Sequence, residues 1–212
     1  MNAATTSSRQ ERRRRETRDE IVRAARAIVI EAGAESLTLR EIARRTDFSA
    51  SALYRYFEGG RQEILLELAR GSLTVLESHL RRVSTALPPD ERIIEMGMVY
   101  LDFARTHGQE ITLIFDSLAA IGPLDESTSD AELLQPTGVL QLLVGSLREG
   151  VEQGVFAIAD EDLLLVMHGA WSYVHGLAVI ERMHDHQPCL FGDRARDLLR
   201  AFVNGFNTEW TR

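Results

Sequence analysis

The chain has 212 residues, enough to bury a substantial core in one or two domains, and its 44% apolar and 26% charged residues are typical of a soluble globular protein. No apolar run approaches the ~20 residues that span a bilayer, and no secretory signal segment is present, so we expect a cytoplasmic protein with no membrane segment. Charge is uneven: residues 1–70 hold 14 arginines against 11 acidic residues, a net of +3, and residues 71–212 hold 10 against 21, a net of −11. A protein with a basic N-terminal part and an acidic remainder can bind a polyanion through the N-terminal part only.

The first 16 residues, MNAATTSSRQERRRRE, have no apolar periodicity, and we expect a flexible, arginine-rich arm that is disordered in the free protein. Arg12, Arg13, Arg14 and Arg15 form the densest positive charge in the chain. One reading is a solvated tail that aids solubility. The position before a predicted helix-turn-helix favours the other reading, an arm that follows phosphates or enters a minor groove.

A first helix is predicted from Thr17, because Thr17 and Glu20 form a capping-box pattern. Its apolar residues recur at helical spacing, and Gly33 is a suitable C-terminal stop. These apolar residues are Ile21, Ala24, Ala25, Ile28 and Val29.

A helix-turn-helix is predicted in the stretch TLREIARRTDFSASALYRYF. Thr38 followed by Glu41 is a second capping box, and it starts a helix with one apolar face. The residues after this helix break the pattern, and Ser49 is placed to cap a second helix from about Ala50 to Phe57. The apolar face of the first helix comprises Leu39, Ile42 and Ala43, opposite Arg40, Arg44 and Arg45.

The second of these helices has the composition of one that lies in a major groove. Small residues at its start let the backbone come close to base edges. Hydroxyl groups and one guanidinium follow for phosphates and bases, and two large apolar residues share the anchoring face. The small residues are Ala50, Ser51 and Ala52. The residues for phosphates and bases are Tyr54, Arg55 and Tyr56, and the anchoring residues are Leu53 and Phe57. The alternative is an ordinary surface helix with half-buried tyrosines.

The segment ALYRYF, preceded by LREIARRTDFSAS, resembles the N-terminal DNA-binding domain of TetR-family transcriptional repressors. The resemblance covers roughly Thr17 to Leu68 and implies a three-helix, all-α reading head. By position, the resemblance implies that Thr38 and Arg40 contact the DNA backbone. It implies the same of Tyr54 and Tyr56, which match the family's phosphate-binding tyrosine and the histidine or tyrosine after it. It assigns the groove-facing positions to Ser49, Ser51, Ala52 and Arg55.

The sequence departs from the family pattern in the turn and at the start of the next helix. Asp47 stands where glycine is usual, although its side chain can bond its own backbone and suits a turn. The family's lysine that opens the fourth helix is absent, and the linker Glu58-Gly59-Gly60 is one residue longer. Arg61 is therefore the expected phosphate contact at this position.

Helical patterns continue to the C-terminus, and no convincing alternating strand occurs. A long helix resumes at Arg61, could bend at Gly71, and ends before Pro88-Pro89. Further helices are predicted at ERIIEMGMVYLDFARTH, GQEITLIFDSLAAI and TGVLQLLVGSLREGVEQG, with an acidic loop between Gly122 and Gln135. We therefore predict an all-α protein in which residues 67–212 form a C-terminal helical bundle.

The last two predicted helices, one after Asp160 and one beginning at DRARD, have wide apolar surfaces. Glycines at 169, 176 and 205 permit close helix approach. A surplus of apolar face favours a homodimer with a four-helix interface, and packing only within the subunit is the alternative. The apolar residues are Leu164, Met167, Trp171, Val174 and Ala178 on one helix, and Leu198, Leu199, Phe202, Val203 and Phe206 on the other. The segment AWSYVHGLAVIE also resembles the Trp-His-Gly signature of one TetR subgroup, in which these two helices dimerise.

An effector site is predicted inside the C-terminal helices, because the resemblance to the TetR family implies a small-molecule ligand there. Such a ligand needs aromatic walls with a few polar groups. The candidates are Tyr100, Phe103, His107, Phe115, Trp171, Tyr173 and His175, with Asp102 and Asp116 as further polar anchors. For any one of them, plain core packing is the alternative.

Catalytic and metal-binding motifs are missing from the sequence. It contains no GxSxG, no phosphate-binding glycine loop and no dinucleotide fingerprint. His168 and His175 lie two helical turns apart and lack a third metal ligand, and His184 and His186 flank a loop. The one cysteine, Cys189, excludes a disulfide framework and a cysteine-cluster metal site. We expect neither an enzyme nor a bound metal or cofactor.

The motifs and the family resemblance together predict a homodimeric repressor that binds a palindromic operator in double-stranded DNA through residues 17–66. A small molecule bound within residues 67–212 would change the separation of the two heads relative to successive major grooves. Two other classes stay open: a helical ligand-carrier or enzyme with an incidental helix-turn-helix-like segment, and a nucleoid-type binder without sequence preference. Activation instead of repression is also open.

Overall fold

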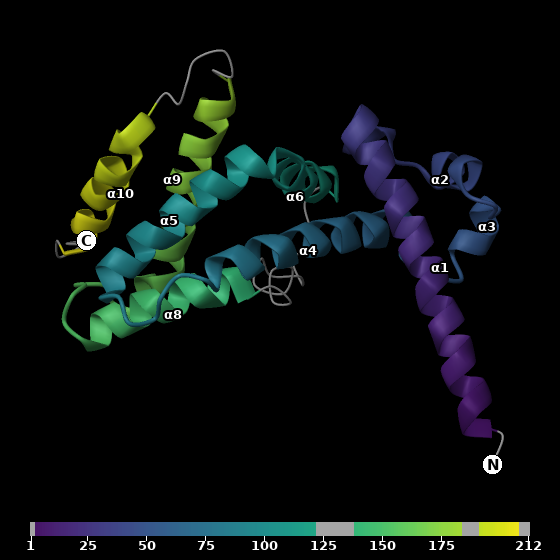
Figure 1. The fold of residues 1–212 in the computed structure, drawn as a ribbon, viewed down its shortest axis with the longest axis horizontal. Coiled ribbons are helices and arrows are strands. Elements are labelled where there is room, and N and C mark those ends of the chain that lie inside the picture. Colours follow the sequence, from purple (N-terminus) through teal and green to yellow (C-terminus); the bar gives the residue numbers. More distant parts are fainter. Residues whose placement is uncertain (1–2, 122–137, 184–190, 208–212) are drawn as a thin grey trace. The chain divides into compact units, whose positions relative to one another are not determined.

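The computed structural model describes residues 3–121, 138–183 and 191–207, and no strand occurs within these ranges (Figure 1). The architecture is all-α, as the helical periodicity predicted. The helices are α1 (Ala3–Ala32), α2 (Leu39–Arg45), α3 (Ala50–Leu53), α4 (Gly60–Leu80), α5 (Pro89–Thr106), α6 (Gly108–Ile121), α8 (Gly138–Glu152), α9 (Leu163–Met183) and α10 (Ala195–Asn204). Short 3-10 turns lie at Ala34–Ser36, Asp160–Asp162, Gly192–Arg194 and Gly205–Asn207.

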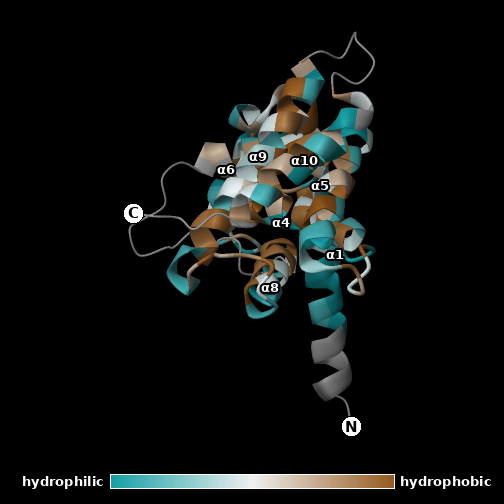
Figure 2. Ribbon diagram, turned by 90° about the vertical axis from the view of Figure 1, so that its left-hand side faces the viewer, coloured by the Kyte–Doolittle hydropathy of each residue, from teal (hydrophilic) through white to brown (hydrophobic). Residues whose placement is uncertain are grey.

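Helix α1 begins far earlier than its predicted start at Thr17. The expectation of disorder over residues 1–16 is therefore wrong from Ala3 onward. No glycine or proline interrupts this segment, and Arg12 pairs with Glu16 one turn later at 3.8 Å, so a polar sequence can continue the packed half of the helix. Figure 2 shows the hydrophilic colour on the turns of α1 that adjoin its grey N-terminal end.

The chain divides into two compact units. Unit 1 comprises residues 1–72 and 109–129, and unit 2 comprises residues 73–108 and 130–212. The division falls inside α4, at Ser72, and it assigns almost all of α6 to unit 1. A helix far along the chain is thus part of the same unit as the predicted helix-turn-helix.

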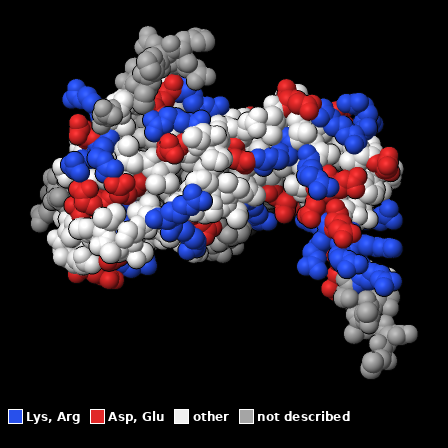
Figure 3. Space-filling model, in the orientation of Figure 1, with Lys and Arg blue, Asp and Glu red and all other residues white. Residues whose placement is uncertain are grey.

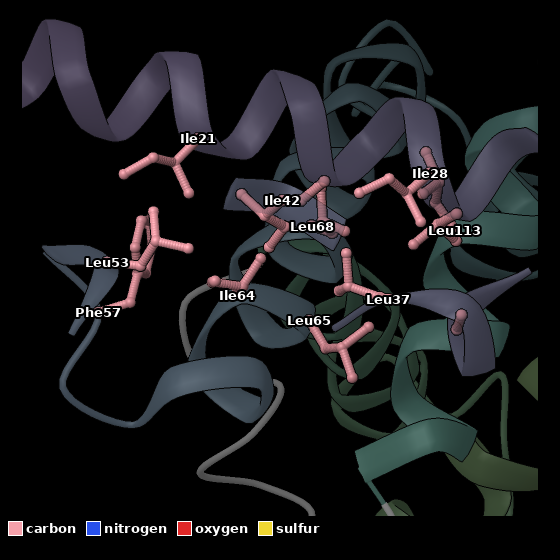
Figure 4. Close-up of a cluster of buried hydrophobic side chains, with 13 residues drawn as sticks. Ile21, Ile28, Leu37, Ile42, Leu53, Phe57, Ile64, Leu65, Leu68 and Leu113 are labelled. Atoms are coloured by element: carbon pink, nitrogen blue, oxygen red, sulfur yellow. The ribbon is translucent and has the colours of Figure 1, made fainter. Parts of the chain in front are cut away.

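Unit 1 is built on one buried apolar cluster, to which α1, α2, α3, α4 and α6 contribute (Figure 4). The cluster comprises Ile21, Ala25, Ile28, Val29, Ala34, Leu37, Ile42, Leu53, Phe57, Ile64, Leu65, Leu68 and Leu113. Four of the five apolar residues predicted for the first helix are among them, so that periodicity is confirmed. The burial of Leu53 and Phe57 confirms the predicted anchoring face.

A polar contact also ties α6 to the rest of unit 1. Glu110, in the first turn of α6, accepts hydrogen bonds from Arg26 of α1 and from the Ser72 hydroxyl of α4, the latter at 2.6 Å. Ser72 is fully buried, so its hydroxyl needs this acceptor. Burial lowers the pKa of Arg26.

Helix α5 lies at the centre of unit 2 and packs against α8, α9 and α10. A Cβ atom at Gly97 of α5 would lie 2.9 Å from two methyl carbons of Leu199 on α10, so any larger residue here would have to displace that buried side chain. The faces predicted for dimerisation are largely used inside the subunit. Met167, Val174 and Ala178 are buried, as are Leu199, Val203 and Phe206, whereas Leu164 is exposed.

Several predicted features of the loops lie outside the described residues. They are the acidic loop after Gly122, together with His184, His186 and Cys189.

Helix α9 with the turn before it, Asp160–Met183, is long and apolar enough by composition to cross a bilayer, and it is the one such helix in the described ranges. It is apolar only on average, since His168, Ser172 and His175 interrupt its apolar residues, so the expectation of no continuous apolar run of that length is not contradicted. The helix packs against α5 and α8 on one side and exposes apolar side chains on another. Packing against α5 and α8 within the helical bundle thus accounts for part of the apolar composition of α9.

Candidate functional site

Helix α2 carries the predicted N-terminal cap. The Thr38 hydroxyl accepts a hydrogen bond from the Glu41 backbone N–H at 3.1 Å. The Glu41 carboxylate accepts from Arg44 and Arg45, and these hydrogen bonds lower the pKa of Glu41 to about 2. Arg44 and Arg45 are therefore engaged within unit 1, whereas Arg40 is exposed.

Helix α3 presents a small and exposed N-terminal turn. The Ser49 hydroxyl accepts from the Ala52 N–H at 3.2 Å and lies 3.1 Å from the Ser51 hydroxyl. Ser49 and Ser51 are exposed, and Ala52 is half-buried. Leu53 is fully buried behind them, so the cap and the anchor hold the predicted groove-facing side chains together.

The chain after Leu53 forms a turn instead of the predicted helix to Phe57. The N–H of Arg55 bonds the Ala52 carbonyl at 3.2 Å, and the N–H of Tyr56 bonds the Leu53 carbonyl at 2.9 Å. Hydrogen bonds to the third preceding residue tighten the backbone relative to an α-helix. We call residues 54–56 the recognition turn.

The Tyr54 ring lies against the glycine linker and is 53% exposed. A Cβ atom at Gly60 would lie 3.1 Å from Cε1 of this ring, and Gly60 has φ +58°. The Gly60 N–H also donates to the Phe57 carbonyl at 3.0 Å. Tyr56 is half-buried, with its ring centroid 6.0 Å from that of Phe48. Of the two predicted backbone-contacting tyrosines, Tyr54 is thus the more accessible.

Two arginines of α1 hold the recognition turn. Arg14 donates to the Arg55 carbonyl at 3.1 Å, and Arg18, one helical turn later, donates to the Tyr56 carbonyl. The turn carbonyls therefore have partners without a further turn of helix. Sequence reasoning missed Arg18, although its i,i+4 spacing from Arg14 places both on one helix face.

Arg18 also joins the turn to the first part of α4. Its guanidinium lies over the Phe57 ring and pairs with Glu63 at 3.3 Å and Glu67 at 3.6 Å. The side chain is 28% exposed, so this set of contacts is partly shielded from water.

Arg61, predicted to contact phosphate, is instead engaged with backbone carbonyls. Its guanidinium donates to Leu37 at 2.9 Å, Ala120 at 3.0 Å and Ala34 at 3.1 Å. Glu35 lies 3.7 Å from the same group. To reach a phosphate, the side chain would have to break these bonds, so the geometry favours a role in holding α6 and the Ala34–Ser36 turn.

The remaining arginines of the basic segment follow α1. Arg12 pairs with Glu16, whereas Arg13 and Arg15 are exposed. Figure 3 shows positive charge gathered next to the grey N-terminal end of the chain. A helical segment that carries these arginines can lie along a phosphate backbone, and so can a disordered segment.

Unit 2 contains a small apolar cavity of about 50 Å³ between α5, α8, α9 and α10. Of the seven predicted effector contacts, Tyr100 and Trp171 line it. Sequence reasoning missed most of its other walls, which include Met96, Leu140, Leu143 and Phe202, because apolar residues of a helix give no local sign of which neighbours enclose a space.

Tyr100 is the polar centre of this cavity's wall. Its hydroxyl lies 3.0 Å from Nδ1 of His175, and it also hydrogen-bonds the Trp171 side chain. Burial raises the pKa of Tyr100, and the bond from Trp171 opposes that shift. Burial, and to a lesser extent the charge of Arg182, lower the pKa of His175. A neutral His175 that accepts from the Tyr100 hydroxyl fits both directions.

The other predicted effector residues lie elsewhere. Phe103 is buried and stacks on His107 at a centroid distance of 4.7 Å. Tyr173 stacks on Phe202 at 4.3 Å, with its hydroxyl donating to a backbone carbonyl. Phe115 belongs to unit 1, so it is not part of this cavity. For Phe103, His107 and Tyr173 the structure supports the packing role.

One face of α9 exposes apolar side chains around small residues. Leu164, Leu165, Val179, Ile180 and Met183 are exposed. A Cβ atom at Gly169 or Gly176 would meet nothing within 4 Å. No group of three or more histidine, cysteine or carboxylate side chains that could hold a metal occurs in the described ranges.

Comparisons with known proteins agree with this geometry. Residues 21–68 match the family model of bacterial regulatory proteins of the tetR family, and residues 93–206 match the model of a tetracyclin repressor-like C-terminal domain. The narrower Trp-His-Gly subgroup remains a prediction. No curated protein matched the sequence.

Solved structures share the fold over nearly the whole chain. A putative tetR family transcription regulator from Shewanella sp. PV-4 has a TM-score of 0.69 and 13% identity, covering 91% of this chain and 98% of that one. The ketosteroid transcriptional regulator KstR2 of Mycobacterium tuberculosis has a TM-score of 0.54 and 21% identity, covering 91% and 96%. RolR in complex with resorcinol has a TM-score of 0.60 and 17% identity, covering 93% and 91%.

Proposed function

Because the chain belongs to the TetR family of bacterial regulatory proteins, we propose that it is a sequence-specific transcriptional repressor whose operator affinity is controlled by a small molecule. The observation that carries this proposal is the exposed, capped turn of α3 mounted on a buried core. Ser49 and Ser51 are exposed there, while Leu53 behind them is fully buried. A rigid, small-residue helix start is what close approach to base edges requires.

The proposal divides the side chains by role. Tyr54 and the exposed Arg40 would bind phosphates and fix the register, together with Thr38, Tyr56 and the basic segment of α1. The groove-facing residues that would read bases are Ser49, Ser51, Ala52 and Arg55. Arg61 is left out of the phosphate set, because its contacts are with backbone carbonyls.

We also propose that the protein acts as a homodimer on a palindromic operator in the cytoplasm. The exposed apolar side chains at both ends of α9 support a second copy as the partner, since an isolated subunit would leave them in water. This face differs from the one expected from sequence, of which only Leu164 is exposed. RolR binds resorcinol, which supports a small-molecule effector on this fold.

The experiment that tests the proposal measures binding of the protein to its own upstream intergenic DNA and to a scrambled duplex, at two salt concentrations. We expect tight binding to the upstream fragment only, with a steep loss as salt rises, because phosphate contacts release counterions. Equal, weak binding to both duplexes would indicate a non-specific binder. Absence of binding at low salt would favour a ligand-carrier or an enzyme.

A further inference from the structure

The exposed apolar side chains of α9 lie along one side of the helix. Leu165 is 59% exposed and Met183 is 76% exposed, and the 18 residues between them make five helical turns, so both point the same way. An exposed apolar surface of this extent on a soluble protein marks an interaction site. We call it the α9 face, and it comprises Leu164, Leu165, Val179, Ile180 and Met183.

The α9 face has the same pattern toward either end of the helix, with the exposed Ser172 at its centre. Leu165 lies seven residues before Ser172, and Val179 lies seven residues after it. Leu164 and Ile180 are likewise eight residues before and eight after. A helix with this pattern matches an identical helix that runs antiparallel to it about a twofold axis at Ser172. Each Leu165 then meets Val179 of the second copy.

The centre of the α9 face permits close approach of two helices. Ser172 is short, and a Cβ atom at Gly169 or Gly176 on either side of it would meet nothing within 4 Å. Packed helices lie roughly 8–10 Å apart, depending on the side chains at the contact, and small residues give the shorter distance. At that distance the larger apolar side chains toward the two ends come into contact.

Charge complementarity favours the antiparallel orientation. The turn before α9, Asp160–Asp162, is acidic, whereas Arg182 is an exposed cation in the last turn of the helix. Asp162 and Arg182 each lie ten residues from Ser172, so antiparallel pairing brings Asp162 next to Arg182 of the second copy. Parallel pairing would place the two acidic turns side by side. Arg182 also donates to the Gly108 carbonyl at 3.3 Å, and a guanidinium has five N–H donors for further contacts.

Helix α10 offers little apolar surface to a second copy. Leu199, Val203 and Phe206 are buried within the subunit. The exposed residues of α10 are small or polar, and they are Asp197, Ala201 and Asn204. A contact between two copies of α9 therefore covers the exposed apolar surface without the second pair of helices that a four-helix interface requires.

We propose that two copies of the chain pair through α9, antiparallel, with the twofold axis at Ser172. The proposal rests on the homodimer of the proposed function and names the contact that forms it. It assigns Leu165 to Val179 of the second copy and Asp162 to Arg182 of the second copy.

The first test is disulfide crosslinking of the full chain, with Cys189, its one cysteine, replaced by serine. A disulfide requires Cα atoms about 4.4–6.8 Å apart. We expect Ser172→Cys to crosslink to itself. Leu165→Cys should not, because the two Leu165 positions would lie about 21 Å apart along the helices at 1.5 Å per residue. After mixing and subunit exchange, Leu165→Cys should crosslink to Val179→Cys.

A matched cysteine at Ala201, an exposed position of α10, reports random collisions between molecules and should stay uncrosslinked. Self-crosslinking of Leu165→Cys above this background would indicate parallel pairing and would overturn the proposal.

The second test enlarges a side chain beside the twofold axis. Gly176→Leu should still fold, because a Cβ atom there meets nothing within the subunit, but the new side chain would hold the two helices apart. We expect the dimer dissociation constant, measured by sedimentation, to rise at least about tenfold, with an unchanged helical circular dichroism spectrum. Gly71→Leu, at an equally open helical glycine of α4, should leave the dissociation constant unchanged.

The outcomes separate this contact from dimerisation itself. A dimer in which Ser172→Cys fails to crosslink, or in which Gly176→Leu dissociates no more readily, would overturn the α9 contact and leave the homodimer in place. A protein that sediments as a monomer would overturn both proposals. Binding of that monomer to phospholipid vesicles would assign the α9 face to a lipid surface instead.

Discussion

The guanidinium carbon of Arg18 lies 4.0 Å from the centroid of the Phe57 ring. The ring is fully buried and anchors the chain that follows the recognition turn, while the arginine comes from the middle of α1. The same guanidinium bonds the Tyr56 carbonyl and pairs with Glu63. One side chain from a distant helix therefore fixes both the end of the recognition turn and the start of α4.

Replacing Arg18 by methionine should destabilise unit 1 while keeping a long apolar stem over the ring. The loss of the cation–π contact and of the bond to the Tyr56 carbonyl predicts a free energy of unfolding lower by about 1–3 kcal/mol. Urea denaturation of the full chain measures it. Arg23→Met is the matched control, because Arg23 is an exposed arginine of the same helix, and it should change stability by less than about 0.5 kcal/mol. Equal losses in both variants would remove the special role of Arg18.

Replacing Gly60 by alanine should disturb the linker and the tyrosine beside it. The left-handed backbone costs a non-glycine residue about 1–3 kcal/mol, and the new methyl group would press on the Tyr54 ring. We therefore expect lower stability and weaker binding to operator and random DNA alike. Gly71→Ala, in an open helical position, should instead stabilise the protein by about 0.5–1 kcal/mol. Circular dichroism melting and DNA titration of both variants test the contrast.

Most of the fold could be predicted because its signals are local. Caps at Thr38 and Ser49 and the apolar spacing of the first helix were read from neighbouring residues, and the structure has them. The helical state of residues 3–16 was missed, since a polar segment shows no periodicity, yet it continues a helix that packing nucleates elsewhere. The placement of α6 in unit 1 was also missed, because the bond of Glu110 to Arg26 joins residues far apart in sequence.

A motif in the sequence fixes which candidate site residues lie together on α3, whereas contacts between distant segments could not be predicted from it. The α3 side chains follow the motif and are exposed together. Arg61 was assigned to phosphate by its position, but its guanidinium meets carbonyls of Leu37, Ala34 and Ala120 that no local pattern brings near it. Five of the seven predicted effector residues do not line the small cavity of unit 2, because an aromatic residue such as Phe103 looks the same in sequence whether it lines a cavity or fills a core.

Replacing Arg61 by lysine should separate a structural role from a phosphate contact. Lysine keeps the charge but cannot donate to three carbonyls in a fork, so we expect stability to fall by about 1–3 kcal/mol. The dependence of the logarithm of operator affinity on that of salt concentration should keep its slope. Arg40→Gln should have the opposite profile, with unchanged stability and a slope reduced by about 1. A reduced slope in Arg61→Gln, measured alongside, would restore the phosphate assignment.

Replacing Arg55 by alanine should relax specificity, because its exposed guanidinium is assigned to base edges. We expect a loss of about 1–3 kcal/mol on the operator and little change on random DNA, with tolerance gained at one or two operator positions. Tyr54→Phe removes one hydroxyl assigned to phosphate and should weaken binding to both duplexes equally. Competition binding with single-base operator variants measures both effects. Equal loss on operator and random DNA for Arg55→Ala would remove the role assigned to Arg55, and a loss confined to the operator for Tyr54→Phe would remove the role assigned to Tyr54.

Replacing His175 by glutamine should change the pH dependence of stability. Burial is the larger cause of the lowered pKa of His175, and the charge of Arg182 is the smaller one. The unfolded chain therefore binds more protons than the folded one just below the ordinary histidine pKa of about 6.5, so stability rises with pH in this range and falls on acidification. His175→Gln should flatten the urea-unfolding free energy between about pH 5 and pH 7. Tyr100→Phe removes the hydroxyl beside Nδ1 but keeps the burial, so most of the slope should persist; a slope lost in both variants would make the hydrogen bond, and not burial, its cause.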